Sequence, residues 1–512
     1  MPTSEPAATE PYRPRLHFSP ARNWMNDPNG LLFHDGTYHL FFQHNPGGPE
    51  WGDIAWGHAT SSDLLTWTEH PVAIPATDHE MIFSGSAVVD AANTSGLGSA
   101  GAGPLVALYT SAYRDHPVHG DNQAQSVAYS TDGGRTWEKY AGNPVHDRGR
   151  TDYRDPKVFW FGPPEGGHWV MAAVDADASR LVVNVSDDLL RWRTTSTFES
   201  ARLPEMWECP DLFPLVVEGS RADGGAAGPG GDVRWVLVLS TSGPGQHYVV
   251  GDFDGERFVE DAAVPTGRVD HGADLYAAAT FNGLAGEPGG VGLGVDAPAG
   301  RRVLIGWMGQ AFRAPTSPWQ GIMSAPRDLG LRAVDGVPRL VSRFSPEVGA
   351  AEREVVSVEG LAVDGAGPGG SGAGATAVVG RGGGLQQRVR ARIVPGSASF
   401  AGVRVLVGEA RGTTIGYDRA TGELVLDRSA SGVAAHDGFA TPRRVPVRLV
   451  DGALTLDVLT DAMSVEVVAN DGEVVVSELV FPGSDAVGVE AFAEGGGAVL
   501  DVRVADVVPE GD

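Results

Sequence analysis

The stretch Trp24-Met25-Asn26-Asp27-Pro28-Asn29-Gly30 places a carboxylate inside a turn sequence, and the apolar run Leu31-Leu32-Phe33 follows at once. Read alone, Asp-Pro-Asn-Gly is a tight turn, because Pro presets φ while Asn and Gly accept positive φ. Two further stretches set a carboxylate beside a proline and an apolar strand, and they are Arg154-Asp155-Pro156-Lys157 and Trp207-Glu208-Cys209-Pro210-Asp211. Three acids at the openings of apolar strands predict a carboxylate site built on a rigid sheet.

The region from about Pro14 to Val341 is predicted to be β-rich. Short apolar runs alternate with turn clusters, and no long segment shows the 3.6-residue periodicity of a helix. A repeat is visible beneath this pattern, because Ser62-Asp63-Leu64-Leu65-Thr66-Trp67 recurs in related form at 130–137 and 186–192. We interpret each copy as a hairpin turn whose Ser and Asp bind the turn backbone and whose Trp packs between sheets, with a degenerate fourth copy at 251–255.

Polar residues also stand at the start of certain apolar strands, and these polar strand openings recur at regular intervals, as the turns do. They lie at Asp27, Ser84-Gly85-Ser86, Asp155, Glu208 and Asp274. Their spacing of about 53 to 71 residues suits one four-stranded propeller blade. Five openings therefore predict five blades around an axis, and a β-sandwich with coincidental turns is the alternative.

The pattern of short apolar runs and turn clusters changes after Arg343-Phe344-Ser345-Pro346. The glycine-rich segment from Gly365 to Gly384 is predicted to be a long flexible loop. Short alternating strands follow it, which indicates a β-sandwich packed against the propeller. The predicted fold is all-β, with a five-bladed β-propeller catalytic domain at 1–346 and a C-terminal β-sandwich domain at 347–512. We expect the sandwich to support the propeller, because it lacks a carboxylate-plus-proline opening.

The composition narrows the function classes. A net charge of −27 over 512 residues argues against nucleic acid or an anionic membrane surface as a partner. The single cysteine, Cys209, excludes an internal disulfide and a cysteine-based metal cluster, and the 14 histidines are scattered, so we expect no metal and no cofactor. No apolar run approaches the ~20 residues of a membrane helix. Met1 to Pro14 shows no secretory signal, so the sequence as it stands predicts a cytoplasmic protein, or a secreted protein if an export signal was removed. We expect a monomer or a homodimer.

The three acids suit the cleavage of a glycosidic bond. Inner strands of a propeller run side by side along the axis, so residues that open three of them converge at one end of the channel. The chemistry needs one ionised carboxyl group and one protonated group, and neighbouring carboxylates supply both states by raising one another's pKa. Arg154 is expected to keep Asp155 ionised or to clamp a sugar hydroxyl. Six aromatic residues near strand ends are candidates for an apolar wall around a sugar ring: Trp24, Trp51, Phe83, Trp207, Trp307 and Trp319.

The chain resembles glycoside hydrolase family 32, the β-fructosidases that include invertases, exo-inulinases and levanases. The resemblance rests on WMNDPNG at 24–30, FFQHNP at 41–46, FSGSA at 83–87, RDPKVF at 154–159 and WECPDLF at 207–213. It continues through 274–277, 306–308, 326–329, 412–418 and 426–428, so it covers most of the chain.

The resemblance implies a five-bladed propeller with a C-terminal sandwich and a reaction that needs no metal. It implies that Asp27 is the nucleophile of a retaining reaction through a fructosyl-enzyme intermediate, that Glu208 is the general acid and then base, and that Asp155 stabilises the oxocarbenium-like state. The candidate substrate-binding residues are Asn26, Gln43, Trp51, Phe83, Ser84, Arg154, Asp274 and Trp307. Cys209 is expected to tune the acid and not to act as a nucleophile.

Departures from the family pattern bear on the substrate. Gly309-Gln310-Ala311-Phe312 stands where the family often has Asn-Asn-Trp or Ser-Asn-Trp, which leaves the leaving-group preference open. The segment 271–276 keeps Asp274 but changes its setting, and 82–96 resembles exo-fructanases more than sucrose-restricted invertases. We expect exo-acting release of terminal fructose from levan or inulin, with sucrose as a secondary substrate.

Other interpretations stay open at this point. A fructosyltransferase or a disaccharide-releasing levanase would use the same three acids. Arabinanase-like or xylosidase-like propellers also use three acids, but they lack the WMNDPNG and ECPDLF strings. A sugar-binding propeller without catalysis belongs to a different class, and the intact acid trio argues against it. Assays on sucrose, inulin and levan would separate these interpretations.

Overall fold

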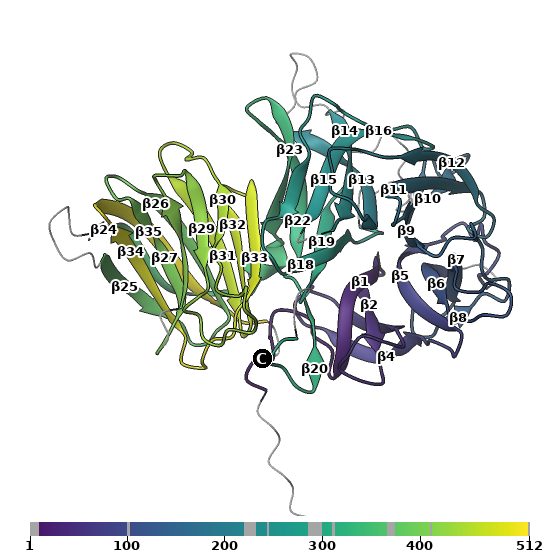
Figure 1. The fold of residues 1–512 in the computed structure, drawn as a ribbon, viewed down its shortest axis with the longest axis horizontal. Coiled ribbons are helices and arrows are strands. Elements are labelled where there is room, and N and C mark those ends of the chain that lie inside the picture. The colour runs from purple at the N-terminus through teal and green to yellow at the C-terminus, as the bar shows by residue number, and fades with distance from the viewer. Residues whose placement is uncertain are drawn as a thin grey trace, which may run out of the picture.

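The computed structural model describes residues 10–99, 103–219, 232–242, 245–284, 300–309, 313–365, 374–409 and 412–509. Strands predominate in this part of the chain and form a propeller on the right of Figure 1 and a sandwich on the left. The predicted fold class, a five-bladed β-propeller followed by a C-terminal β-sandwich, is confirmed. Among the described residues, no helix has the length and apolar character that a membrane crossing requires.

Blades I to III each consist of four antiparallel strands, numbered from the axis outward. Blade I contains β1 (Asn23–His34), β2 (Thr37–Asn45), β3 (Ala55–Ser61) and β4 (Thr68–Ile74). Blade II contains β5 (Glu80–Val89), β6 (Leu105–Tyr113), β7 (Gln123–Ser130) and β8 (Glu138–Lys139). Blade III contains β9 (Tyr153–Phe161), β10 (His168–Asp175), β11 (Arg180–Ser186) and β12 (Arg193–Phe198).

Blades IV and V share hydrogen bonds through a parallel pair between β13 and β22. Blade IV contains β13 (Glu208–Glu218), β14 (Val233–Ser240), β15 (Gln246–Phe253) and β16 (Phe258–Glu260), with β17 (Gly267–Asp270) beside β15. Blade V contains β18 (Leu275–Thr280), β19 (Arg302–Met308), β22 (Arg327–Val334) and β23 (Val337–Phe344), with β21 (Ile322–Met323) beside β19. The short strand β20 (Trp319–Gln320) pairs with β1, so the last blade is tied to the first.

The repeated turn of the sequence joins the third and fourth strands of blades I, II and III. In each copy one Asp carboxylate accepts two backbone N–H bonds, and these residues are Asp63, Asp132 and Asp188. The tryptophan four or five residues later donates its indole N–H to a carbonyl of the turn at 2.8 to 3.1 Å. The residue that supplies this carbonyl has positive φ in every copy, and it is Leu64, Gly134 or Leu189. The sequence repeat therefore marks one structural element of the blade, as predicted.

The sandwich consists of two six-stranded sheets around an aliphatic core. The first sheet contains β24 (Glu352–Asp364), β35 (Gly497–Val507), β26 (Gln387–Val394), β31 (Leu454–Asp461), β32 (Ser464–Ala469) and β33 (Val474–Leu479). The second contains β25 (Ala375–Arg381), β34 (Gly488–Glu494), β27 (Phe400–Val407), β28 (Thr413–Asp418), β29 (Glu423–Asp427) and β30 (Arg443–Pro446).

The expectation of a flexible loop from Gly365 to Gly384 is wrong for its second half. Residues 375–381 form β25, which pairs with β34, because Thr376, Val378 and Val379 supply β-branched side chains that suit a sheet edge. Residues 366–373 lie outside the described residues. The predicted domain division after residue 346 falls within the short helix α1 (Pro346–Ala350) and stays a prediction.

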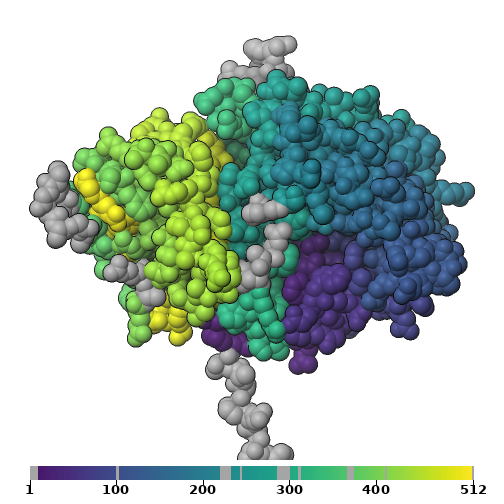
Figure 2. All heavy atoms as spheres, in the orientation of Figure 1, coloured from purple at the N-terminus to yellow at the C-terminus, as the bar shows by residue number. Residues whose placement is uncertain are grey.

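The sandwich adjoins blade V along one seam, which Figure 2 shows as a border between yellow-green and teal atoms. Fully buried Arg327 of β22 lies in this seam. Its guanidinium contacts Asp270 of the propeller at 2.8 Å and, from the sandwich, Ser477 at 2.5 Å and Glu466. Removing one partner of such a buried pair would leave an uncompensated charge, so these contacts favour the observed arrangement of the two domains.

Candidate active site

All five innermost strands are irregular at the level of the predicted site. Their hydrogen-bond registers shift at 25–28, 83–85, 154–157, 208–211 and 276–279. Asp155, Cys209 and Ala277 adopt positive φ at these shifts. Because a bulge re-aims the side chains around it, the five strands turn polar groups toward one end of the axis.

Asp27 stands in the first of these irregular segments and is held by two polar neighbours. The Ser84 hydroxyl donates to Asp27 Oδ2 at 2.7 Å, and the Asn26 amide donates to Oδ1 at 3.1 Å. Asn26 is itself oriented by the Trp24 indole N–H at 2.8 Å. Burial raises the pKa of Asp27, and the Ser84 and Asn26 donors oppose that rise. The result is an oriented carboxylate at the mouth of the channel.

Asp155 is buried beside Asp27, and its Oδ2 accepts the backbone N–H of Cys209 at 2.9 Å. Burial raises the pKa of Asp155 to about 7; Arg154 opposes the rise, and Glu208 adds to it. Burial thus opposes the ionised state that Arg154 favours, and the expectation that Arg154 keeps Asp155 ionised or clamps a sugar hydroxyl stays a prediction.

Glu208 opens β13 and receives two strong donors. The Tyr276 hydroxyl lies 2.5 Å from Glu208 Oε2, and Arg154 Nη2 lies 3.0 Å from Oε1. Arg154 also donates to Gln123 at 3.2 Å and to Asp152 at 3.1 Å, which fixes its plane. Burial and the neighbouring Glu208 raise the pKa of Tyr276, so this group is a neutral hydrogen-bond donor.

The Cys209 thiol lies between two acids, 3.6 Å from Asp27 Oδ2 and 3.7 Å from Asp155 Oδ2. Burial, and then the surrounding carboxylates, raise the pKa of the thiol well above its ordinary value. A thiol held neutral in this way is a poor nucleophile. The contacts instead make Cys209 a weak donor that bridges the two carboxylates.

Aromatic side chains stand around the acids, but the six candidates divide into two groups. Trp24 and Trp307 meet edge to face with ring centroids 6.0 Å apart, and Trp51 meets Phe83 at 6.1 Å. Trp51 is 54% exposed, so it lies on the rim and not on the floor. The other two, Trp207 and Trp319, are buried in the hydrophobic core.

Two predicted substrate-binding residues have other surroundings. Gln43 is buried, and its amide donates to the Ile82 carbonyl at 2.9 Å. Asp274 is fully buried in the seam between the domains. Arg428 contacts its carboxylate at 2.5 Å, and the Leu479 backbone N–H donates to the same carboxylate at 2.8 Å. The structure therefore does not bring Asp274 together with the other candidates.

Sequence reasoning also missed site residues. The sequence marks Tyr276 only as part of the family motif at 274–277. Its position two residues after Asp274 does not predict a contact with Glu208. The signal available was its place at the start of the fifth inner strand. Residues Gln310, Ala311 and Phe312, which bear on the leaving-group preference, lie outside the described residues.

The axis narrows directly below the acids. A cavity of about 30 Å³, lined by Asp155, Lys157, Ser84 and Thr280 among others, is large enough for one or two water molecules. The Lys157 ammonium bonds the Thr280 carbonyl at 2.8 Å and pairs with Asp211 at 3.2 Å, which links blades III, IV and V. The described residues contain no group of three or more His, Cys, Asp or Glu side chains arranged to hold a metal ion. The reactive groups of the site are therefore carboxyls, with this small cavity beside them.

Comparison with known proteins gives consistent matches over both domains. Residues 17–342 match the model for the Glycosyl hydrolases family 32 N-terminal domain, and residues 365–507 match the model for the Glycosyl hydrolases family 32 C terminal. A levanase of Bacillus subtilis is 38% identical over 506 residues, which cover 95% of this chain and 69% of that protein.

Fungal proteins are similar over almost their whole length. An extracellular exo-inulinase of Aspergillus ficuum is 38% identical over 536 residues, which cover 97% of this chain and 94% of that protein. The crystal structure of an exo-inulinase from Aspergillus awamori aligns with a TM-score of 0.85 at 34% identity, covering 98% of this chain and 99% of that chain.

Proposed function

Because the chain belongs to glycosyl hydrolase family 32, we propose that it hydrolyses β-fructosides with retention and releases terminal β-D-fructofuranosyl residues from levan, inulin and sucrose. The observation that carries the proposal is the convergence of Asp27, Asp155 and Glu208 on one mouth of the propeller, with Cys209 in contact with two of them. Relatives named levanase, exo-inulinase and invertase support the substrate class.

Asp27 is the proposed nucleophile. In the first step one of its oxygens bonds to the anomeric carbon of fructose while the bond from that carbon to the leaving oxygen breaks. In the second step water attacks the same carbon and Asp27 departs as a carboxylate. Burial disfavours the charged carboxylate, so formation of the neutral ester relieves part of that cost. The Ser84 and Asn26 donors keep the attacking oxygen oriented.

Glu208 is the proposed acid and base. As a carboxylic acid it gives its proton to the leaving oxygen, and as a carboxylate it then takes a proton from the attacking water. Arg154, 3.0 Å away, stabilises the carboxylate that remains after the first transfer. The Tyr276 hydroxyl at 2.5 Å orients the group during both steps.

Asp155 takes no part in bond making in this proposal. Its buried carboxyl lies beside the nucleophile, where it accepts hydrogen bonds from fructose hydroxyls and offsets the positive charge of the oxocarbenium-like transition state. Trp24 and Trp307 supply apolar surface near the ring, and the exposed Trp51 on the rim supplies a surface for the leaving group.

The test measures sugar release from sucrose, inulin and levan, with methanol added as a competing acceptor. A retaining enzyme transfers fructose to methanol as the β-methyl fructoside, and the Asp27→Asn variant forms neither this product nor free fructose. Formation of the α-methyl fructoside would exclude the covalent route. Absence of release from all three substrates would reject the proposed activity.

A further inference from the structure

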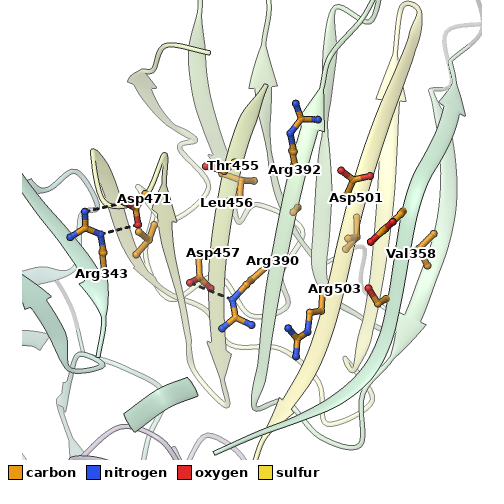
Figure 3. A pocket seen from close by; sticks show the side chains of 15 residues that line it. Arg343, Val358, Arg390, Arg392, Thr455, Leu456, Asp457, Asp471, Asp501 and Arg503 are labelled. Atoms are coloured by element: carbon orange, nitrogen blue, oxygen red, sulfur yellow. Dashed lines mark hydrogen bonds and ion pairs between the residues drawn. The ribbon is translucent and has the colours of Figure 1, made fainter. Parts of the chain in front are cut away.

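The outer face of the first sandwich sheet carries a hollow of about 430 Å³ that shares no residue with the active site. Figure 3 shows that its side chains project from neighbouring strands of the sandwich, while Arg343 reaches the edge from blade V. Ten of the fifteen residues that line the hollow carry polar or charged side chains, and these are Arg343, Ser357, Glu359, Arg390, Arg392, Thr455, Asp457, Asp471, Asp501 and Arg503.

The hollow is electrically balanced in a strongly acidic protein. Its lining holds four arginines and four carboxylates, whereas the whole chain has 65 acidic residues against 38 basic ones. A polyanion would gain nothing from such a surface, and neither would a cation. The balance therefore fits a neutral ligand that both donates and accepts hydrogen bonds.

Neighbouring strands place these donor and acceptor side chains in regular rows, and we call this arrangement the lattice. Arg392 of β26 stands opposite Thr455 on one side and Asp501 on the other, and Arg390 stands opposite Asp457. Adjacent strands lie about 4.8 Å apart, and same-face residues of one strand about 6.7 Å apart. Donors and acceptors at these intervals can engage several hydroxyl groups of one sugar chain at once.

Five of the eight charged groups in this lattice are already held in ion pairs, and these are Arg343, Arg390, Arg503, Asp457 and Asp471. Arg390 binds Glu352 through two contacts, at 2.7 and 2.5 Å, so it contributes mainly to rigidity. Asp501 receives the Gly360 N–H at 2.8 Å through Oδ1. No ion pair links Arg392 to another side chain in the part of the chain that the structure describes, and its side chain is exposed. Arg392, Thr455 and Asp501 are thus the groups available to a ligand.

We propose that this hollow is a second carbohydrate-binding site, and that it holds an internal segment of a β-fructan chain. The identity of the polymer rests on the proposed function, whereas the polyhydroxylated class rests on the lining itself. No aromatic residue lines the hollow, so a single sugar binds weakly there. A polymer held at one point, however, presents its other chain ends to the enzyme at a raised effective concentration.

The experiment compares the double variant Arg392→Gln/Thr455→Val with the wild type on levan, inulin and sucrose. Sucrose is too small to gain from a distant site, so it provides the reference rate. We expect the ratio of kcat/KM on polymer to kcat/KM on sucrose to fall about three- to tenfold, mostly through KM. The matched control is Arg353→Gln, an exposed arginine outside the hollow, which keeps the wild-type ratio.

A binding measurement separates this proposal from the proposed function. The Asp27→Asn protein is run through native gels that contain levan, inulin or no polymer, with and without the double substitution. Retardation that the double substitution abolishes supports the hollow even if no hydrolysis is detected. An unchanged polymer-to-sucrose ratio, or equal retardation with and without the double substitution, overturns the proposal.

Discussion

Arg154 Nη2 lies 3.0 Å from Glu208 Oε1. The same guanidinium approaches Asp155 only to 3.9 Å, through Nε. Arg154 directly precedes Asp155 in the sequence, yet its shorter contact is with Glu208 of the next blade. This geometry gives Arg154 a direct hydrogen bond to the group that must gain and lose a proton in the proposed reaction, while its charge also acts on Asp155.

The first prediction concerns that group. Glu208→Gln should lower turnover of sucrose about 10²- to 10⁴-fold, because sucrose needs a proton on its leaving oxygen. An aryl β-fructoside with an activated leaving group departs without that proton, so its bond-cleavage step should slow far less. Stopped-flow release of the aryl group measures this step. Equal losses on both substrates would assign Glu208 a binding or structural role.

The second prediction separates the turn role of an aspartate from a chemical role. Asp27→Ala should lower kcat by four or more orders of magnitude and change the free energy of unfolding by no more than about 3 kcal/mol. The control is Asp63→Ala, which removes a carboxylate that accepts two backbone N–H bonds in the repeated turn. That control should lose stability and keep near-native kcat, and the reverse pattern would contradict the assignment of Asp27.

Much of the fold was predictable because it is encoded locally. Each repeated turn carries its own Ser, Asp and Trp, and each inner strand begins with its own polar opening. These signals act within about ten residues, so they can be read without knowledge of the rest of the chain. The spacing of Asp27, Asp155 and Glu208 then led to a shared mouth, since propeller topology brings strand openings together.

The remaining features depend on distant partners. Asp274 opens the fifth inner strand as the other polar residues open theirs, yet it pairs with Arg428, 154 residues away. Tyr276 contacts Glu208 from a neighbouring blade, and nothing beside it in the sequence indicates this. Strand β25 follows a glycine run, and its strand conformation is set by pairing with β34. Tertiary contacts determined these outcomes, so local patterns did not reveal them.

The third prediction follows from the burial of Asp155. Its pKa is about 7 in the folded protein against an ordinary value of 3.8, so the unfolded state loses its proton first as pH rises. The folded state is therefore destabilised progressively between about pH 4 and pH 7, and the penalty is constant above pH 7. Asp155→Asn removes the cost of the buried charge. We expect the variant to lose activity and to be more stable than the wild type at pH 8, by up to about 4 kcal/mol.

The measurement is urea unfolding of both proteins between pH 4 and pH 8. The stability difference should be near zero at pH 4, grow as pH rises, and level off above pH 7. A difference that does not depend on pH would show that the substitution acts through packing and not through the carboxylate charge.

The fourth prediction concerns the seam between the domains. His17 lies between Asp461 at 2.8 Å and Glu466 at 2.7 Å. Burial lowers the pKa of His17, but these two carboxylates raise it further, to about 9. The contribution of His17 to stability is therefore full below pH 6.5 and is lost as pH rises through 9.

His17→Gln should accordingly lower the free energy of unfolding by about 3 kcal/mol at pH 6, and the deficit should shrink toward pH 10. Thermal unfolding across this pH range measures the effect. His34→Gln is the control, because His34 is partly exposed and lies 3.5 Å from the exposed Asp35. A deficit that is the same at pH 6 and pH 10 would rule out the ionic contribution.

The last prediction is exo-acting release of free fructose from the ends of β-fructan chains. Beside the acids the axis holds a cavity of only about 30 Å³, and the Lys157–Asp211 pair crosses between blades there. A chain cannot thread through so small a space, so a terminal residue reaches Asp27 and an internal one does not. Trp51, exposed on the rim, leaves room for the rest of the polymer outside the site.

Chromatography of early levan and inulin digests should then show fructose with little intermediate oligomer. A ladder of oligosaccharides at low conversion would require an open cleft that runs past the acids. A dominant disaccharide would mean that two rings fit within the site. The pattern should persist in Trp51→Ala with a raised KM for polymer, because the depth of the site sets the product size while the rim contributes only to binding of the leaving chain.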